Sequence, residues 1–128
     1  MIDRRALVGG ATVATLLGGT AVAAGGAADR YGMIGRITAK PGQRAALAGL
    51  LLAGSADMPG CLSYVVSEDL ADPDALWVAE AWDSKASHAA SLSLPGVRAS
   101  IAGARPLIAD FTTTAEVRPL GGTGLGRR

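Results

Sequence analysis

The side chains best suited to chemistry lie close together near the middle of the sequence. The only histidine of the chain, His88, follows shortly after both tryptophans. Glu80 and Trp82 lie two positions apart in a segment that is typical of a β-strand, so their side chains point to the same side of it. His88 lies on the predicted helix that comes next. An acid, a large ring and an imidazole therefore come close together, which predicts a site for a small molecule.

Glu80 lies between apolar neighbours in its predicted strand. A buried carboxylate needs a polar partner, because otherwise its pKa rises. The sequence leaves two interpretations open. In one, Glu80 orients His88 or hydrogen-bonds a ligand. In the other, it forms an ion pair with Arg36 or Arg98.

Aromatic and cationic side chains complete the set of candidate ligand-binding residues. Trp82 and Tyr64 can stack on a planar molecule, although packing in the core or in a dimer interface is an alternative role for both. Arg36 lies in the first predicted strand and can steady an oxyanion, or it can be a surface arginine. Cys61 follows a Pro-Gly turn with no base beside it, which indicates a buried structural thiol.

Apolar periodicity and turn residues place these side chains on a series of short elements. The pattern predicts strands and helices in the order β-α-β-β-α-β, which is the ferredoxin-like, split βαβ arrangement of an α+β domain. Strands are expected over 31–39, 61–68, 75–83 and 111–118, and helical segments over 43–56, 84–92 and 97–108. Ser84 is expected to cap the helix that carries His88.

The predicted strand 75–83 is largely apolar on both of its faces. A single layer of helices covers only one face of a four-stranded sheet, so the other face needs a second cover. We therefore expect a homodimer that forms through the bare sheet face, with the same surface used by both subunits.

Composition excludes several classes of function. The chain has 12 Lys and Arg against 11 Asp and Glu, and neither sign forms a block. It therefore lacks the basic patch that nucleic-acid binding requires. Its single cysteine cannot form an internal disulfide, and no cluster of cysteine and histidine residues suggests a metal site.

The first 28 residues have the layout of an export signal. Arg4 and Arg5 precede a mildly apolar stretch without charges, and Ala21-Val22-Ala23 provides small residues for cleavage. The arginine pair favours the twin-arginine route, and hence a periplasmic or extracellular location with no stable membrane insertion once the signal is removed. The alternative is a permanent N-terminal membrane anchor, for which so many glycines and alanines give a weak driving force.

The chain is thus expected to comprise an export signal over 1–28, one small domain over 29–118 and a glycine-rich tail over 119–128. Several segments of that domain and tail, in this order and spacing, resemble the antibiotic biosynthesis monooxygenase family, and in particular its quinol monooxygenases. The segments are Tyr31-Gly-Met-Ile-Gly-Arg-Ile-Thr-Ala-Lys-Pro-Gly-Gln43, Met58-Pro-Gly-Cys-Leu-Ser-Tyr64, Trp77-Val-Ala-Glu-Ala-Trp-Asp-Ser84, His88-Ala-Ala-Ser-Leu-Ser-Leu-Pro95, Arg105-Pro-Leu-Ile-Ala109 and Gly121-Gly-Thr-Gly-Leu125.

The resemblance implies a dimeric α/β barrel with a buried pocket in each subunit. It also implies that the protein oxygenates a quinol or another phenolic aromatic with O2 and uses no metal, haem or flavin. The alternative is a non-catalytic dimeric barrel that only binds a small aromatic ligand. The chain departs from the family in having Thr123 where many relatives carry a histidine. It also contains no asparagine, which argues against the haem degradation carried out by some relatives.

Oxygenation of this kind requires removal of the phenol proton. Histidine is the side chain that changes charge near neutral pH, so His88 is the expected base, with Glu80 as its catalytic partner. The alternative for His88 is a structural role on its helix. Tyr64, Trp82 and Arg36 are the expected substrate-binding residues.

Overall fold

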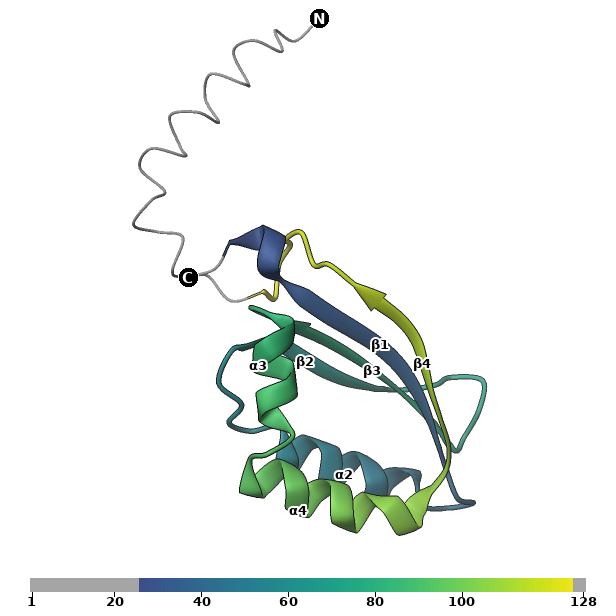
Figure 1. The fold of residues 1–128 in the computed structure, drawn as a ribbon. Coiled ribbons are helices and arrows are strands. Elements are labelled where there is room, and N and C mark those ends of the chain that lie inside the picture. Colours follow the sequence, from purple (N-terminus) through teal and green to yellow (C-terminus); the bar gives the residue numbers. More distant parts are fainter. Residues whose placement is uncertain (1–25, 126–128) are drawn as a thin grey trace, which may run out of the picture.

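A computed structural model describes residues 26–125 as a sheet with one layer of helices (Figure 1). The strands pair antiparallel in the order β2-β3-β1-β4. They comprise Tyr31–Ala39 (β1), Cys61–Glu68 (β2), Ala75–Trp82 (β3) and Ile108–Val117 (β4). The element order confirms the predicted ferredoxin-like α+β fold.

Helices Arg44–Gly54 (α2), Lys85–Ser91 (α3) and Pro95–Ala104 (α4) all cover the same side of the sheet. Short 3₁₀ turns at Ala27–Asp29 (η2) and Arg105–Leu107 (η3) precede β1 and β4. No helix within residues 26–125 combines the length and the apolar character needed to cross a bilayer. Almost all of the predicted export signal lies outside the described residues.

The helices begin where the sequence provides suitable first residues. The Ser84 hydroxyl accepts a hydrogen bond from the backbone N–H of Ser87 at 3.0 Å and so caps α3, as expected. Pro95 occupies the first turn of α4, where its missing N–H costs nothing. These two starts fix the position of α3, and hence of His88, directly after β3.

The core lies between the sheet and helices α2 and α4. Leu47 of α2 and Leu76 of β3 are fully buried there, and Ile37, Val78 and Ala104 pack with them. Because these residues face one another from β1, β3 and both long helices, their burial holds the helical layer on the sheet. The core occupies only part of the space between the two layers, which leaves room beside it.

The end of α4 and the start of β4 differ from the predicted boundaries. The helix ends at Ala104, and the strand begins at Ile108 rather than at residue 111. Pro106 accounts for this difference, because proline lacks the N–H of a helical hydrogen bond and clashes with the preceding turn. The chain therefore leaves the helix through the η3 turn.

Strict alternation along β4 predicts Phe111, Thr113, Ala115 and Val117 on one face, and this prediction is partly wrong. Phe111 pairs with Ile37, whereas Ala115 pairs with Ile34, and the register shifts between these two pairs. An extra residue in one strand reverses the alternation of side chains beyond it. Phe111 consequently lies on the helix side of the sheet and Ala115 on the opposite side.

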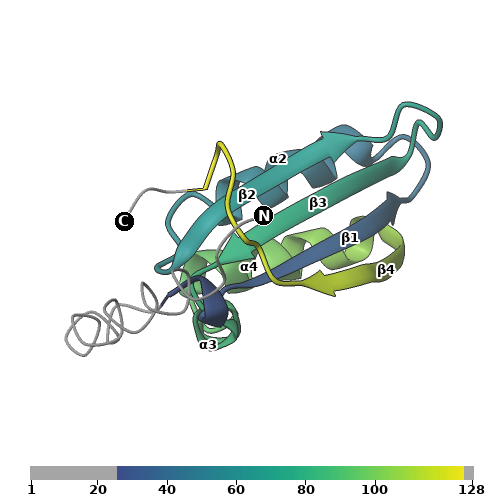
Figure 2. The same cartoon turned by 90° about the horizontal axis from the view of Figure 1, so that it is seen from above.

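Figure 2 looks onto the face of the sheet that carries no helix. Ile34, Val65 and Val117 are between 36% and 51% exposed on this face, and Trp77 of β3 is half-buried there. Residues 26–125 contain no element that covers this face. It is the surface through which the sequence predicts a homodimer.

The contact between α2 and α4 gives a test of the packing. A Cβ added at Gly54 would overlap Ser100 of α4, whereas at Gly49 it would meet nothing within 4 Å. We expect Gly54→Ala to lower the free energy of unfolding by about 1–3 kcal/mol through overpacking. The control Gly49→Ala should raise it by about 0.5–1 kcal/mol, because alanine favours a helix over glycine. Equal effects of the two substitutions in denaturant titrations would contradict this packing.

Candidate active site

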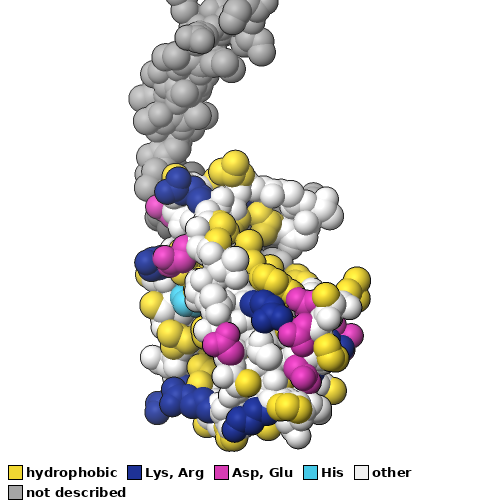
Figure 3. Space-filling view, turned by 90° about the vertical axis from the view of Figure 1, so that its right-hand side faces the viewer, with side chains coloured by type: hydrophobic (Ala, Val, Ile, Leu, Met, Phe, Trp, Pro, Cys, Tyr) yellow, Lys and Arg dark blue, Asp and Glu magenta, His cyan; other side chains and the backbone are white. Residues whose placement is uncertain are grey.

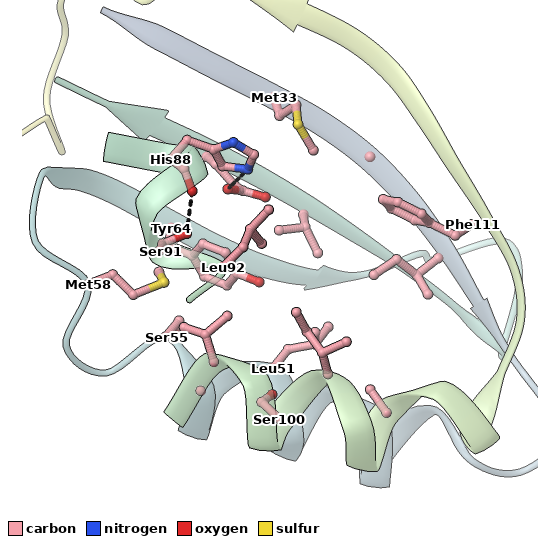
Figure 4. Close-up of a pocket in the computed structure, with 18 of the residues that line it drawn as sticks. Met33, Leu51, Ser55, Met58, Tyr64, His88, Ser91, Leu92, Ser100 and Phe111 are labelled. Atoms are coloured by element: carbon pink, nitrogen blue, oxygen red, sulfur yellow. Dashed lines mark hydrogen bonds and ion pairs between the residues drawn. The ribbon is translucent and has the colours of Figure 1, made fainter. Parts of the chain in front are cut away.

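A cavity of about 520 Å³ lies between the sheet and the helices, beside the core (Figure 4). Strands β1, β2 and β3 form its floor, α2 and α4 form the opposite wall, and α3 closes one end. Most of its lining side chains are apolar, including Met33, Leu51, Met58, Ile101 and Phe111. A pocket of this size and character suits a small organic molecule.

Glu80, Trp82 and His88 meet at the α3 end of the cavity, as the sequence predicts. The Trp82 indole N–H donates a hydrogen bond to Glu80 Oε1 at 2.9 Å, and His88 Nε2 lies 3.8 Å from the same oxygen. The Glu80 and His88 side chains retain 13% and 18% of their surface exposure, while Trp82 is 1% exposed. A proton acquired by His88 would thus be held beside a carboxylate that Trp82 keeps in place.

The imidazole of His88 lies between two aromatic rings. Its centroid is 5.4 Å from the Trp82 ring, which it meets edge-on, and 5.3 Å from the Tyr31 ring. The Ser91 hydroxyl donates to the His88 carbonyl at 2.6 Å and steadies the same turn of α3. The cyan atoms in Figure 3 show that the histidine reaches the molecular surface, so it can exchange protons with solvent.

Tyr31 is itself fixed by a neighbouring strand. Its hydroxyl donates to Glu116 Oε2 of β4 at 2.6 Å, and Lys85 lies 3.6 Å from that oxygen and 5.5 Å from the Tyr31 ring centre. The hydrogen bond to Glu116 is the main reason why the pKa of Tyr31 rises to about 12, and it also lowers the pKa of Glu116. Tyr31 therefore stays protonated and provides a rigid wall beside His88.

Tyr64 of β2 lies beside Glu80 in the sheet and lines the cavity. Burial is the main cause that raises its pKa to about 12, and the negative charge of Glu80 adds to it. Within residues 26–125, its hydroxyl has no hydrogen-bond partner. Tyr64 is therefore a neutral donor at neutral pH, available to a bound oxygen atom.

The structure does not bring Arg36 to the cavity, which corrects the expectation that it binds substrate there. Side chains alternate along β1, and Arg36 lies on the bare face of the sheet. It pairs with Asp72 at 2.8 Å and with Asp69 at 3.7 Å, and Trp77 donates to Asp69 at 2.8 Å. The proposed ion pair between Arg36 and Glu80 is likewise wrong, because the two side chains lie on opposite faces.

Sequence reasoning missed several residues that shape the site, namely Tyr31, Met33, Gly35 and Phe111. Met33 pairs with Glu80 across β1 and β3, and Tyr31 pairs with Trp82. Side chains alternate along β1, so Tyr31, Met33 and Gly35 lie on the opposite face from Arg36, and that signal is present in the sequence. The sequence does not reveal the register of strand pairing that places these residues opposite the predicted site.

Comparisons with known proteins agree with this fold. Residues 30–103 match the family described as antibiotic biosynthesis monooxygenase. A candidate antibiotic biosynthesis monooxygenase from Chloroflexus aurantiacus J-10-fl is 53% identical, with a TM-score of 0.72 over 77% of this chain and 100% of that one. No protein in the curated set is significantly similar.

More distant structures share the fold. A protein from Pseudomonas aeruginosa is 24% identical, with a TM-score of 0.66 over 76% of this chain and 100% of that one. A candidate family member from Caulobacter crescentus CB15 is 17% identical, with a TM-score of 0.66 over 73% and 92% of the two chains. The match over residues 30–103 and the 53% identical structure show that the chain belongs to the antibiotic biosynthesis monooxygenase family, and this membership supports a general monooxygenase role.

The two tyrosines of the chain give a test of the site's electrostatics. Tyr31 and Tyr64 both have a pKa of about 12 in the folded protein, against 10 for an ordinary tyrosine. Absorbance at 295 nm should therefore show no phenolate formation near pH 10 while the fold persists. Because the folded pKa values are raised, the resulting stabilisation is complete below pH 10 and is lost between pH 10 and 12. A tyrosine that titrates near pH 10 in the folded protein would contradict these environments.

Proposed function

We propose that this protein is a cofactor-independent monooxygenase that oxygenates a quinol or another phenolic aromatic with O2. The observation that carries the proposal is the pair of His88 and Glu80 at one end of an otherwise apolar cavity. The base can remove a proton from a phenol, and the apolar walls can accept the ring and exclude water. Membership of the antibiotic biosynthesis monooxygenase family supports the same role.

The reaction balances without an external reductant. A hydroquinone and O2 give a hydroxyquinone and water, so one oxygen atom enters the ring and the other leaves as water. The ring supplies all four electrons that reduce O2. Deprotonation is the step for which the protein is needed, because a phenolate transfers an electron to O2 more readily than a neutral phenol does.

The residues of the cavity can assist this step in separate ways. His88 Nε2 takes the phenol proton, and Glu80 stabilises the imidazolium 3.8 Å away. The neutral hydroxyl of Tyr64 can donate to the oxygen that becomes negative, which stabilises it without adding a charge. Trp82 contributes by holding Glu80 and by forming part of the wall.

Removing the base tests the proposal. Loss of general-base catalysis costs about 100- to 10,000-fold in rate. His88→Ala should lower O2 uptake with an active hydroquinone by that order. Arg98→Ala, which alters an exposed residue of α4 outside the cavity, serves as the control and should keep the original rate.

The outcome separates the two candidate functions. A folded protein that binds hydroquinones but consumes no O2 with any of them would be a binding protein rather than an enzyme. An active protein whose His88→Ala variant keeps its full rate would exclude His88 as the base.

We also propose that two subunits pair through the bare sheet face, where Ile34, Val65 and Val117 are partly exposed. A charge buried among these apolar residues in the interface would be desolvated without a partner. Val65→Glu should therefore yield monomers in sedimentation velocity runs at micromolar concentration, whereas Leu70→Glu, in an exposed loop, should not change the assembly. A native protein that sediments as a monomer would refute the dimer.

A further inference from the structure

Apart from the exposed Arg105, the charged and polar groups available to a ligand lie at one end of the cavity. Glu80, His88 and Tyr64 are there, whereas the serines of the remaining wall use their hydroxyl groups elsewhere. Ser55 donates to Leu52 at 3.1 Å, and Ser100 donates to Leu50 at 2.6 Å, in both cases to a backbone carbonyl. Apart from the exposed Arg105, the wall away from His88 therefore offers a ligand almost no hydrogen bonds, and an apolar group suits it.

A glycine lies in the strand that forms the floor of this apolar part of the cavity. Gly35 lies in the middle of β1 on the helix side of the sheet, opposite Val78, and lines the cavity. Glycine weakens a strand and often marks a place where a ligand approaches the backbone closely. An added Cβ here would project toward the Phe111 ring, 3.2 Å from its nearest carbon. The missing side chain thus lets the Phe111 ring lie close against β1, and the passage that runs from the polar end past Gly35 ends at this ring.

Phe111 marks the far end of that passage. In Figure 4 it lies across the cavity from His88, with Leu51 and Ser100 on the wall between them. The Phe111 residue is 53% exposed although it points to the helix side of the sheet. An apolar group lying along Gly35 would bury part of this ring.

The volume of the cavity exceeds what a single aromatic ring needs. A cavity of about 150 Å³ is enough to hold benzene, and this one measures about 520 Å³. We propose that the physiological substrate carries an apolar substituent, such as an alkyl chain, with its hydroxylated ring at His88 and the substituent along Gly35 toward Phe111. This deepens the proposed function, on which the identity of the ring rests.

Binding of 2-alkylhydroquinones without O2 tests the proposal apart from turnover. Methyl, butyl and octyl derivatives are compared by isothermal titration calorimetry under nitrogen. Each buried methylene should tighten binding by about fourfold until the chain fills the passage. Octylbenzene, which lacks the hydroxyl groups, should bind at least tenfold more weakly than octylhydroquinone if the polar end recognises the ring.

Two variants locate the substituent. Gly35→Val pushes against the Phe111 ring and narrows the passage, so it should abolish the gain from the longer chain and leave methylhydroquinone binding within about twofold. Phe111→Ala removes the far wall without disturbing a buried side chain, so it should weaken octylhydroquinone binding alone, by about three- to tenfold. Gly49→Ala, which adds its methyl group to open space on α2, is the control and should change neither affinity.

The possible results distinguish this inference from the proposed function. Affinity that does not depend on chain length, or a chain-length gain that survives both Gly35→Val and Phe111→Ala, would overturn the substituent site even if O2 is consumed. An increase in affinity with chain length that both variants reduce would support the substituent site even if no hydroquinone is oxidised. In that case only the proposed monooxygenase activity would be refuted.

Discussion

A carboxylate on the covered face of the sheet is the constraint on which the rest of the site depends. Glu80 occupies a position at which strand alternation demands an inward side chain, between Met33 and Tyr64 of the neighbouring strands. A charge at such a position must be compensated by polar neighbours. The indole N–H of Trp82 meets this demand directly, and the imidazole of His88 lies within reach of the same oxygen. Both Glu80 and His88 line the cavity, so the compensated carboxylate forms part of its polar end.

Most of the fold could be predicted from local patterns. The bounds of β1 and β2 match the sequence-based expectation, because turns with proline and glycine delimit both strands. Ser84 marked the start of α3 for a similarly local reason, since a serine oxygen is a good partner for the first helical N–H groups. By contrast, Ile108 fitted the helical spacing of α4 and was assigned to the wrong element, because Pro106 stops the helix first.

The candidate site was predictable only to the extent that its residues are neighbours in the sequence. Glu80, Trp82 and His88 belong to one strand and the helix after it, so their approach follows from strand alternation and from the cap. Tyr31 and Phe111 come from other strands, and their positions depend on a register that includes a shift in β4. Arg36 was misplaced for a simpler reason. Side chains alternate along β1, and Arg36 occupies a position that faces the side of the sheet without helices. Its ion-pair partners there come from the acidic loop after β2.

The hydrogen bond between Tyr31 and Glu116 joins the first strand of the sheet to its last, across 85 residues of sequence. The wall beside the histidine is therefore assembled from both ends of the domain, and the pairing of β1 with β4 is among the most non-local contacts in the fold. Contacts of this range are slow to form because a long loop must close first. A ribosome-bound chain that lacks its last strand can hold the acid and the imidazole on adjacent elements, yet it lacks one side of their enclosure. The pocket thus matures only when translation of the domain is complete, and a premature stop before residue 116 would leave a chain without a finished site.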